Sequence, residues 1–284
     1  MNTPTSTQIL SYTRWSRELP VLRQRYTTAE PFPHIVLDNF LEREAAEQAL
    51  AEFPPMDSAD WLHYKHLNQN KQAKIDRSTF GPLTGLVFDE LNSDRFLQFL
   101  SQLTGISSLI PDHSLHGGGL HQSGRGGFLN IHADFTVHPY HPDWQRRVNA
   151  IVYLNKNWDD SYSGHLELWD RLMQRCEQKI APVFNRCVIF NTDVDSFHGL
   201  PDPLTCPEGV TRKSLALYYF TQETKPLVAR STEYRARPDD GFRRVWIYLD
   251  KMTIRLYHTV KSRFGLSDKL ASRIAGFVFR PKGK

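Results

Sequence analysis

The first hundred residues alternate between a short extended run and stretches in which apolar positions recur at helical spacing. Residues 1–30 are polar and predict a helical or irregular lead-in, and the proline-bounded run at 31–38 predicts a strand. Over 41–53, five apolar residues fall on one stripe at helical spacing, namely Ala45, Ala46, Ala49, Leu50 and Phe53. A second helical stretch over 83–103 contains polar, helix-breaking residues at 92–94, where we expect an interruption.

From residue 115 onward the helical periodicity disappears, and glycine-rich turns separate short apolar runs. Four of these runs are rich in β-branched and aromatic residues and predict strands at Val148–Leu154, His165–Trp169, Cys187–Asn191 and Ser214–Thr221. Short strands that follow a helical N-terminal portion indicate an α+β chain, with helices packed on an antiparallel sandwich or open barrel.

The end of the chain returns to helical spacing. Apolar residues interleave with Lys and Arg over 246–260, and a turn at 265–268 precedes a last predicted helix. We therefore divide the chain into a lead-in at 1–30, a core domain at 31–224 and a helical C-terminal appendage at 225–284.

The charge of the chain is unevenly distributed, and most of the excess positive charge lies in the C-terminal appendage. The 284 residues carry a net charge of +4, but residues 251–284 hold nine Lys or Arg and a single acid, so this tail is +8 and the rest is −4. Three roles fit a basic tail: packing on the core or on a second copy in a homodimer, peripheral contact with an anionic membrane surface, or binding of an acidic substrate. No nucleic-acid-binding motif is visible, so no nucleic-acid partner is expected.

The remaining composition bears on the compartment. No run of about 18 apolar residues occurs, so we expect no membrane span. The N-terminus lacks the charged start and apolar stretch of a secretory signal. The three cysteines, Cys176, Cys187 and Cys206, show no CxxC spacing and cannot all pair with one another, which favours a reducing cytoplasm.

One short motif suggests metal chemistry. His132 and Asp134 are two residues apart, so in an extended strand they present an imidazole and a carboxylate to the same face. His198 follows a predicted strand and would complete the set from the other side of a barrel. Two histidines and one carboxylate leave the opposite positions of a metal open, which suits non-haem Fe(II). The HxD pattern alone is common by chance and gives a weak signal.

The neighbourhood of the motif adds a cation. Arg212 begins the last predicted strand of the core, where its guanidinium could hold a dicarboxylate with Ser214 on the same face. Without the metal set, a fold-stabilising ion pair would be the better explanation of Arg212. His138 and His141, in the sequence HPYHPDW, are expected on an exposed loop rather than among the ligands.

Five segments together resemble a known family. In chain order they are PFPHIVLDNFL, GGFLNIHADF, VNAIVYLNKNWDDSYSGHLELWD, CVIFNTDVDSFHGL and TRKSLALYYFT. Their order and spacing resemble the prolyl-4-hydroxylase-like branch of the Fe(II)- and 2-oxoglutarate-dependent oxygenases over residues 31–224. The resemblance implies a double-stranded β-helix core of the jelly-roll or cupin-like kind, with N-terminal packing helices.

The resemblance also implies roles for single residues. Those to which it gives a part in iron or cosubstrate binding are His132, Asp134, His198, Arg212, Tyr153, Ser214 and Gln122. The first three would ligate Fe(II), Arg212 and Tyr153 would hold the distal carboxylate of 2-oxoglutarate, and the last two would be further contacts, with His121 as the alternative to Gln122. O2 would be the co-reactant and ascorbate an additional candidate cofactor. The common Gly-Gly of the family stands here as Gly164-His165.

The implied activity is hydroxylation of an aliphatic C–H bond, in a prolyl residue of a peptide or in a small molecule, with release of succinate and CO2. Related halogenases lack the carboxylate ligand, so Asp134 argues against halogenation. Two alternatives remain: a cupin-like metal enzyme that uses no 2-oxoglutarate, and a non-catalytic barrel that only binds a ligand. Arg212 and Tyr153 disfavour the first alternative, and the complete ligand set disfavours the second.

Overall fold

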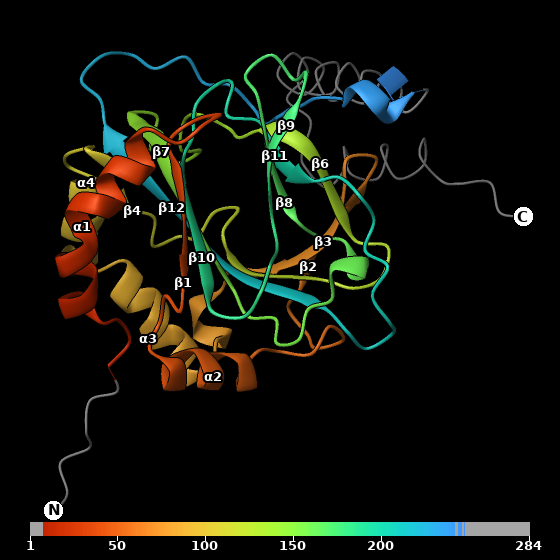
Figure 1. Ribbon diagram of the computed structural model, residues 1–284, viewed down its shortest axis with the longest axis horizontal. Helices are drawn as coiled ribbons and strands as arrows, with labels where there is room; N and C mark the ends of the chain where they lie inside the picture. Colours follow the sequence, from red (N-terminus) through yellow and green to blue (C-terminus); the bar gives the residue numbers. More distant parts are fainter. Residues whose placement is uncertain (1–7, 242–243, 246, 248–284) are drawn as a thin grey trace, which may run out of the picture.

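The computed structural model describes residues 8–241, 244–245 and 247 (Figure 1). Most of the predicted C-terminal appendage, residues 248–284, lies outside the described residues, as do residues 1–7 of the lead-in. Within the described part, no helix has the length and apolar character needed to cross a bilayer.

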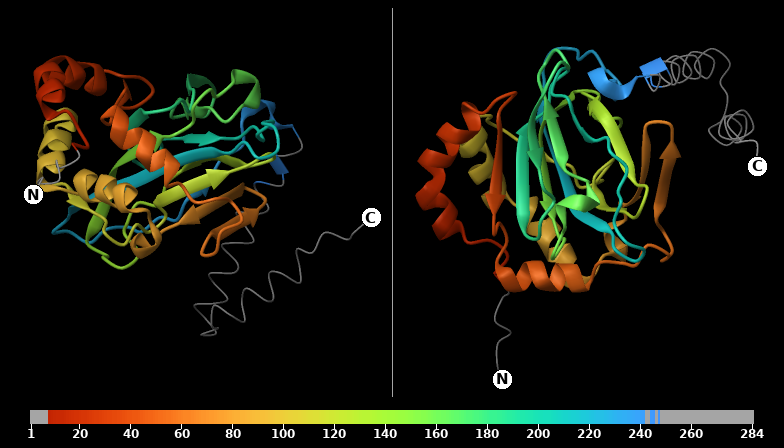
Figure 2. Two further views of the ribbon diagram at one scale, coloured as in Figure 1. Left: turned by 90° about the horizontal axis from the view of Figure 1, so that it is seen from below. Right: turned by 45° about the vertical axis from the view of Figure 1, so that its right-hand side comes forward.

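Four helices pack together on one side of a curled sheet (Figures 1 and 2). Their bounds are α1 Tyr12–Thr27, α2 Arg43–Ala51, α3 Pro82–Leu91 and α4 Asp94–Thr104. The predicted stripe of α2 is buried through its three alanines. The predicted break at 92–94 separates α3 from α4, because the Ser93 side chain accepts a hydrogen bond from the Phe96 amide and starts a new helix. Gly105, with φ of 76°, ends α4 in the left-handed conformation.

Thirteen strands form one antiparallel sheet in the described residues. They are β1 His34–Asp38, β2 Leu62–His66, β3 Gln69–Lys74, β4 Ile110–Pro111, β5 Gly119–Ser123, β6 Phe128–Ala133, β7 Trp144–Tyr153, β8 Leu166–Trp169, β9 Cys176–Ile180, β10 Arg186–Asn191, β11 His198–Leu200, β12 Arg212–Gln222 and β13 Glu233–Tyr234. The main path runs β1-β10-β7-β12-β5-β3-β6-β11-β8-β9. The sheet curls so that its two halves face each other, and the predicted α+β barrel architecture is confirmed (Figure 2).

The alternation of side chains along the central strands sets the position of the interior. In β7, Val148, Ala150 and Val152 join the apolar core shared with the helices. Their neighbours Asn149 and Tyr153 point the other way and line a cavity inside the barrel. The strand therefore separates the apolar core on the helical side from the interior of the barrel, where the cavity lies beside a second apolar cluster that includes Tyr153.

Two elements absent from the sequence-based prediction border this interior. The hairpin of β2 and β3 lies across the barrel from α1 (Figure 1). β13 pairs with β6 opposite Ala133 and His132, so part of the chain beyond residue 224 returns to the core sheet.

Candidate active site

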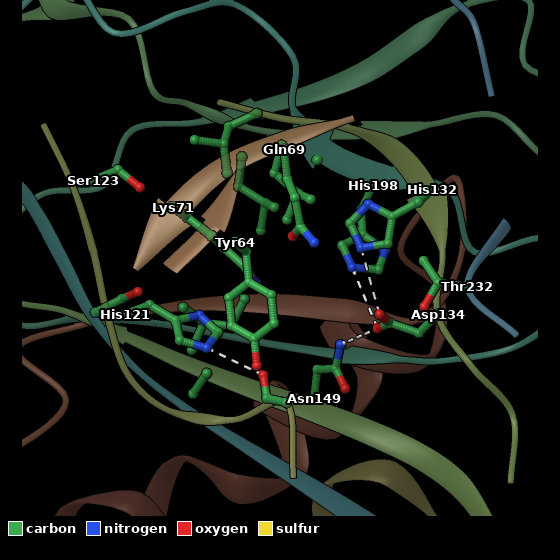
Figure 3. Close-up of a pocket in the computed structure, with 18 of the residues that line it drawn as sticks. Tyr64, Gln69, Lys71, His121, Ser123, His132, Asp134, Asn149, His198 and Thr232 are labelled. Atoms are coloured by element: carbon green, nitrogen blue, oxygen red, sulfur yellow. Dashed lines mark hydrogen bonds and ion pairs between the residues drawn. The ribbon is translucent and has the colours of Figure 1, made fainter. Parts of the chain in front are cut away.

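A cavity of about 330 Å³ lies inside the barrel (Figure 3). Its walls come from β2 and β3, from β5, β6 and β11, from β7 and β12, and from β13. The volume is at the lower end of the range of about 300–1,000 Å³ that is usual for small-ligand sites. Histidines, arginines, a lysine and a carboxylate share this small space, so the cavity is polar at its centre.

The structure brings the three predicted metal ligands together at one end of the cavity (Figure 3). His132 lies near the end of β6 and pairs across the ladder with His198, the first residue of β11. Asp134 follows the end of β6. The Nε2 atoms of both histidines lie 3.4 Å from carboxylate oxygens of Asp134, and one ligand atom from each residue falls within 4.8 Å of the others.

Backbone carbonyls orient the two imidazoles. The Nδ1 of His132 lies 2.8 Å from the carbonyl oxygen of Asn130, and the Nδ1 of His198 lies 2.9 Å from that of Ser196. Each Nδ1–H therefore donates to a carbonyl, which leaves the Nε2 lone pair directed at the shared point. Burial lowers the pKa of His198 to about 4, although Asp134 opposes this, so the ring is neutral at pH 7.

The carboxylate of Asp134 has its own support. Burial acts to raise its pKa, but the groups around it, above all the Arg146 guanidinium, outweigh burial and hold the pKa well below its usual value. Arg146 contacts Oδ2 at 2.9 Å, and the Asn149 side-chain amide donates to the same oxygen at 2.8 Å. Two imidazoles and one ionised carboxylate are the donor set that the sequence motif predicts for a divalent metal.

Arg146 and Asn149 were not found by the sequence reasoning, and Arg146 could not be found from strand alternation. Residues 146 and 149 have opposite parity and would face opposite sides of a regular strand. The pairing of β7 with β12 shifts by one residue between Tyr219 and Phe220, which places an extra residue in β7 at this point. This bulge turns Arg146 to the cavity side, where its guanidinium also lies 3.4 Å from the ring centroid of Tyr218.

The predicted cosubstrate contacts lie at another part of the cavity wall. Arg212, Tyr153 and Ser214 all line the cavity. The guanidinium carbon of Arg212 lies 4.8 Å from the ring centroid of Tyr153, and its Nε donates to the carbonyl of Gly164 at 2.8 Å. Gly164 has φ of 80°, and a Cβ there would lie 3.2 Å from the Cδ of Arg212. A glycine at this position therefore avoids a close contact with the Arg212 side chain.

The hydroxyl of Tyr153 is buried and has no hydrogen-bond partner among the described residues. Burial raises the pKa of this phenol, although the nearby Arg212 opposes the increase, so the hydroxyl keeps its proton. A buried donor without an acceptor is costly unless a ligand completes it. Tyr153 and Arg212 therefore form an incomplete binding site for an acceptor.

The structure does not bear out the inward position expected of Gln122, and its contact with the cosubstrate stays a prediction. Gln122 does not line the cavity, and its amide donates instead to the Thr211 hydroxyl at 2.7 Å. On β5 it is the neighbours His121 and Ser123 that face inward. His121 is held by the carbonyls of residues 117 and 118, each 3.1 Å from its Nε2.

The expectation of an exposed loop at His138 is also wrong, whereas His141 is exposed as expected. His138 is only 2% exposed, and its ring packs against Trp144 and Phe220, at centroid distances of 5.4 and 5.1 Å. It does not line the cavity. Aromatic packing, which residue type alone did not reveal, explains its burial.

Comparisons with known proteins agree with this geometry. Residues 118–220 match the family described as the 2OG-Fe(II) oxygenase superfamily. No curated protein matches the chain. Among solved structures, a prolyl-4-hydroxylase from Pseudomonas putida aligns with 18% identity and a TM-score of 0.51, covering 72% of this chain and 99% of its own.

A second similar structure is a prolyl hydroxylase from Trichoplax adhaerens in complex with a peptide fragment of the oxygen degradation domain of hypoxia inducible factor. It aligns with 17% identity and a TM-score of 0.53, covering 74% of this chain and 91% of its own. At these identities the likeness shows a shared fold. The match of residues 118–220 to the 2OG-Fe(II) oxygenase superfamily and the double-stranded β-helix fold shared with the prolyl-4-hydroxylases together support a 2-oxoglutarate-dependent dioxygenase.

Proposed function

We propose that His132, Asp134 and His198 hold the Fe(II) of this hydroxylase, and that it inserts oxygen into an aliphatic C–H bond while 2-oxoglutarate becomes succinate and CO2. The observation that carries the proposal is the convergence of three ligand atoms within 4.8 Å beside a buried, incomplete arginine–tyrosine site. Neither half alone has this specificity, since structural His–Asp pairs and structural arginines are both common.

The donor set fits Fe(II). Both imidazoles keep their Nδ1–H bonded to backbone carbonyls, so no rearrangement is needed before Nε2 binds a metal. The carboxylate of Asp134 is ionised because the positive charge of the Arg146 guanidinium, which contacts Oδ2, stabilises its negative charge. Iron bound by these residues would activate O2 with 2-oxoglutarate as the reductant, and the protein would orient the cosubstrate and the substrate.

The arginine–tyrosine pair fits the distal carboxylate of 2-oxoglutarate. Arg212 is 7% exposed and fixed through Nε, so its remaining N–H groups are available to a ligand at a defined place. The Tyr153 hydroxyl would donate to the same carboxylate and thereby gain its missing partner. Ser214 lies two residues along the same strand face and would be a further contact. These groups orient the cosubstrate toward the histidines.

The substrate is either a peptidyl residue or a small molecule. The Trichoplax adhaerens structure holds a peptide, which makes a peptidyl substrate one candidate for this chain. The alternative of a metal enzyme without 2-oxoglutarate predicts activity that does not depend on the keto acid, and the Arg212–Tyr153 site disfavours it.

The test begins with binding. The full chain is loaded with Mn(II), and 2-oxoglutarate is titrated by calorimetry with succinate as the control ligand. We expect 2-oxoglutarate binding that depends on the metal and much weaker binding of succinate, which lacks the keto group. With Fe(II), O2 and ascorbate, succinate formation is then followed with and without candidate peptides and metabolites, and mass spectrometry searches for a gain of one oxygen. Keto-acid binding that is indifferent to metal would contradict the proposal.

A further inference from the structure

Lys71 is a cation of the cavity that the proposed chemistry does not use. It lies on β3, with Tyr64 of β2 and Gln69 beside it on the same hairpin, and all three side chains line the cavity (Figure 3). The residue after Lys71, Gln72, pairs with Gln122 of β5. The residue after Gln122, Ser123, pairs in turn with Arg212 of β12. Lys71, Ser123 and Arg212 therefore follow one another across three adjacent strands.

Lys71 differs from the other cations around the cavity because it has no hydrogen-bond acceptor within the part of the chain that the structure describes. Arg146 bonds to Asp134 and Asn149, and Arg212 donates to a backbone carbonyl. On the same strand, Lys74 donates to the carbonyl of Ala59 at 3.1 Å. Among the described residues Lys71 has no hydrogen-bond or ion-pair partner, and its nearest aromatic ring, Tyr64, has its centroid 5.8 Å from Nζ.

The charge balance of the cavity leaves room for an anion. The charged residues that line it are Lys71, Arg146, Arg212 and Asp134. Arg146 and Asp134 neutralise each other at 2.9 Å. Divalent iron and dianionic 2-oxoglutarate also cancel in charge, so the cavity keeps an excess of positive charge after both have bound. Lys71 is half-buried in the cavity wall. A partly desolvated cation without a counter-charge is a candidate for binding an anionic ligand.

We propose that Lys71 recognises a negatively charged group, a carboxylate or a phosphate, on the primary substrate of this enzyme. The inference rests on the proposed function, because it takes the Arg212 site to be filled by the cosubstrate. The ammonium would donate to the acidic group, and the Tyr64 hydroxyl, which also faces the cavity, is placed on the same hairpin to assist.

Electrostatics agree with this role. Burial lowers the pKa of Lys71 to about 8, partly opposed by Asp134 and reinforced by Arg146 and Arg212. The ammonium thus remains mainly protonated at pH 7, and no carboxylate among the described residues forms an ion pair with it. An anion bound there would restore the missing interaction, and a neutral substrate would not.

The experiment uses the full chain loaded with Mn(II) and saturated with 2-oxoglutarate, so that the metal and the Arg212 site are filled. Inorganic phosphate is the probe, titrated by calorimetry into wild type, Lys71→Met, Lys71→Arg and Lys65→Met. Lys65 is a matched control because it lies on the same hairpin but is exposed. We expect phosphate to bind wild type and Lys65→Met equally, Lys71→Arg within about threefold, and Lys71→Met at least about tenfold more weakly.

The affinity for 2-oxoglutarate is measured in parallel, and we expect it to change less than about twofold in Lys71→Met. A loss of 2-oxoglutarate affinity in that variant would overturn the inference, because it would assign Lys71 to the cosubstrate. Absence of phosphate binding to wild type, or equal binding by Lys71→Met, would overturn it as well. Circular dichroism verifies that each variant is folded.

Failure of the proposed function has a different signature, namely that wild type does not bind 2-oxoglutarate at all. The phosphate titration is then repeated on metal-free protein, where the comparison of Lys71→Met with Lys65→Met still decides the role of Lys71. In turnover assays, compounds are offered in pairs that differ only by an acid and its amide, or by a phosphate and its free alcohol. We expect the acidic member of a pair to stimulate succinate formation and Lys71→Met to raise its KM at least about tenfold.

Discussion

The two parts of the cavity wall differ in how completely their polar groups are satisfied. Around the metal ligands, each imidazole Nδ1 is bonded to a carbonyl, and Asp134 contacts Arg146 and Asn149. Around Arg212, the Tyr153 hydroxyl has no partner, and Lys71 has none among the described residues.

The protein thereby divides its binding tasks between two parts of the cavity wall. The chain's own hydrogen bonds orient the three proposed metal ligands, which sets their geometry before any ligand binds. The other wall leaves donors open, so its full set of hydrogen bonds forms only when an anionic ligand enters. Changes to the first wall should therefore affect metal binding, and changes to the second should affect the organic ligands.

The largest effect is expected for the ligand set itself. His132→Ala removes one of three metal ligands, and we expect succinate formation to fall to the background rate while the thermal unfolding temperature of the metal-free protein changes little. Succinate is measured by chromatography after incubation with Fe(II), 2-oxoglutarate and ascorbate. His113→Ala, at an exposed histidine, is the control and should retain wild-type turnover. Wild-type turnover by His132→Ala would refute the iron assignment.

Arg212→Met should weaken 2-oxoglutarate binding by about 10- to 100-fold, because charge-assisted hydrogen bonds contribute about 1.5–3 kcal/mol. Metal affinity should remain close to wild type, and both are obtained from calorimetry. Gln122→Ala is the matched comparison, since its side chain faces away from the cavity, and should leave 2-oxoglutarate affinity unchanged. Equal effects of the two substitutions would contradict the division between the walls.

Acid should destabilise the metal-free protein through His198. Its pKa is about 4 in the folded chain and about 6.5 in the unfolded chain, so the unfolded state takes up the proton first as the pH falls. The stabilising contribution is complete above about pH 6.5 and is lost toward pH 4. Between about pH 7.5 and 5 we expect a loss of about 2 kcal/mol in the free energy of unfolding, measured with urea. His198→Asn should show a smaller loss over this interval, and an equal loss would show that other groups cause it.

Arg146→Met should lower metal affinity about tenfold, because groups that orient a ligand typically contribute about 10- to 100-fold. Without the guanidinium the pKa of Asp134 rises, so metal binding should also begin to fail at a higher pH than in wild type. Arg147→Met is the control, because the adjacent side chain is 35% exposed and does not line the cavity. A metal affinity unchanged across the pH range would show that the contact of Arg146 with Asp134 is incidental.

Much of the scaffold follows from periodic signals. The alanine stripe of α2, the break at Ser93 and the four strongest strands all agree with their predicted positions, because burial on one face imposes a regular spacing of apolar residues. The HxD motif was readable for the same reason, since strand geometry places His132 and Asp134 on one side. Arg212 and Tyr153 reach the cavity through the same alternation.

What the sequence did not predict lacks such a signal. The β2–β3 hairpin is largely polar and partly exposed on both faces, so its strands show no apolar alternation. Arg146 reaches the metal wall through a bulge, which breaks the parity on which prediction depends. Gln122 and His121 are adjacent, and a shift of one residue decides which faces inward. These are effects of register, and register is set by tertiary pairing.

The position of β3 in the sheet has a consequence for how specificity can change. Along one edge, β3 bonds to β6 through Gln69 and Asn70 and to β5 through Gln72–Lys74, whereas β2 pairs with its other edge. β3 therefore joins the half of the barrel that carries Arg212 to the half that carries the proposed metal ligands. The strand that carries Lys71 is thus also the strand that connects the two halves of the barrel. An insertion or deletion in this hairpin would change both the substrate preference and the separation between the two halves of the barrel. A point substitution at one of its inward-facing positions would change the substrate preference alone.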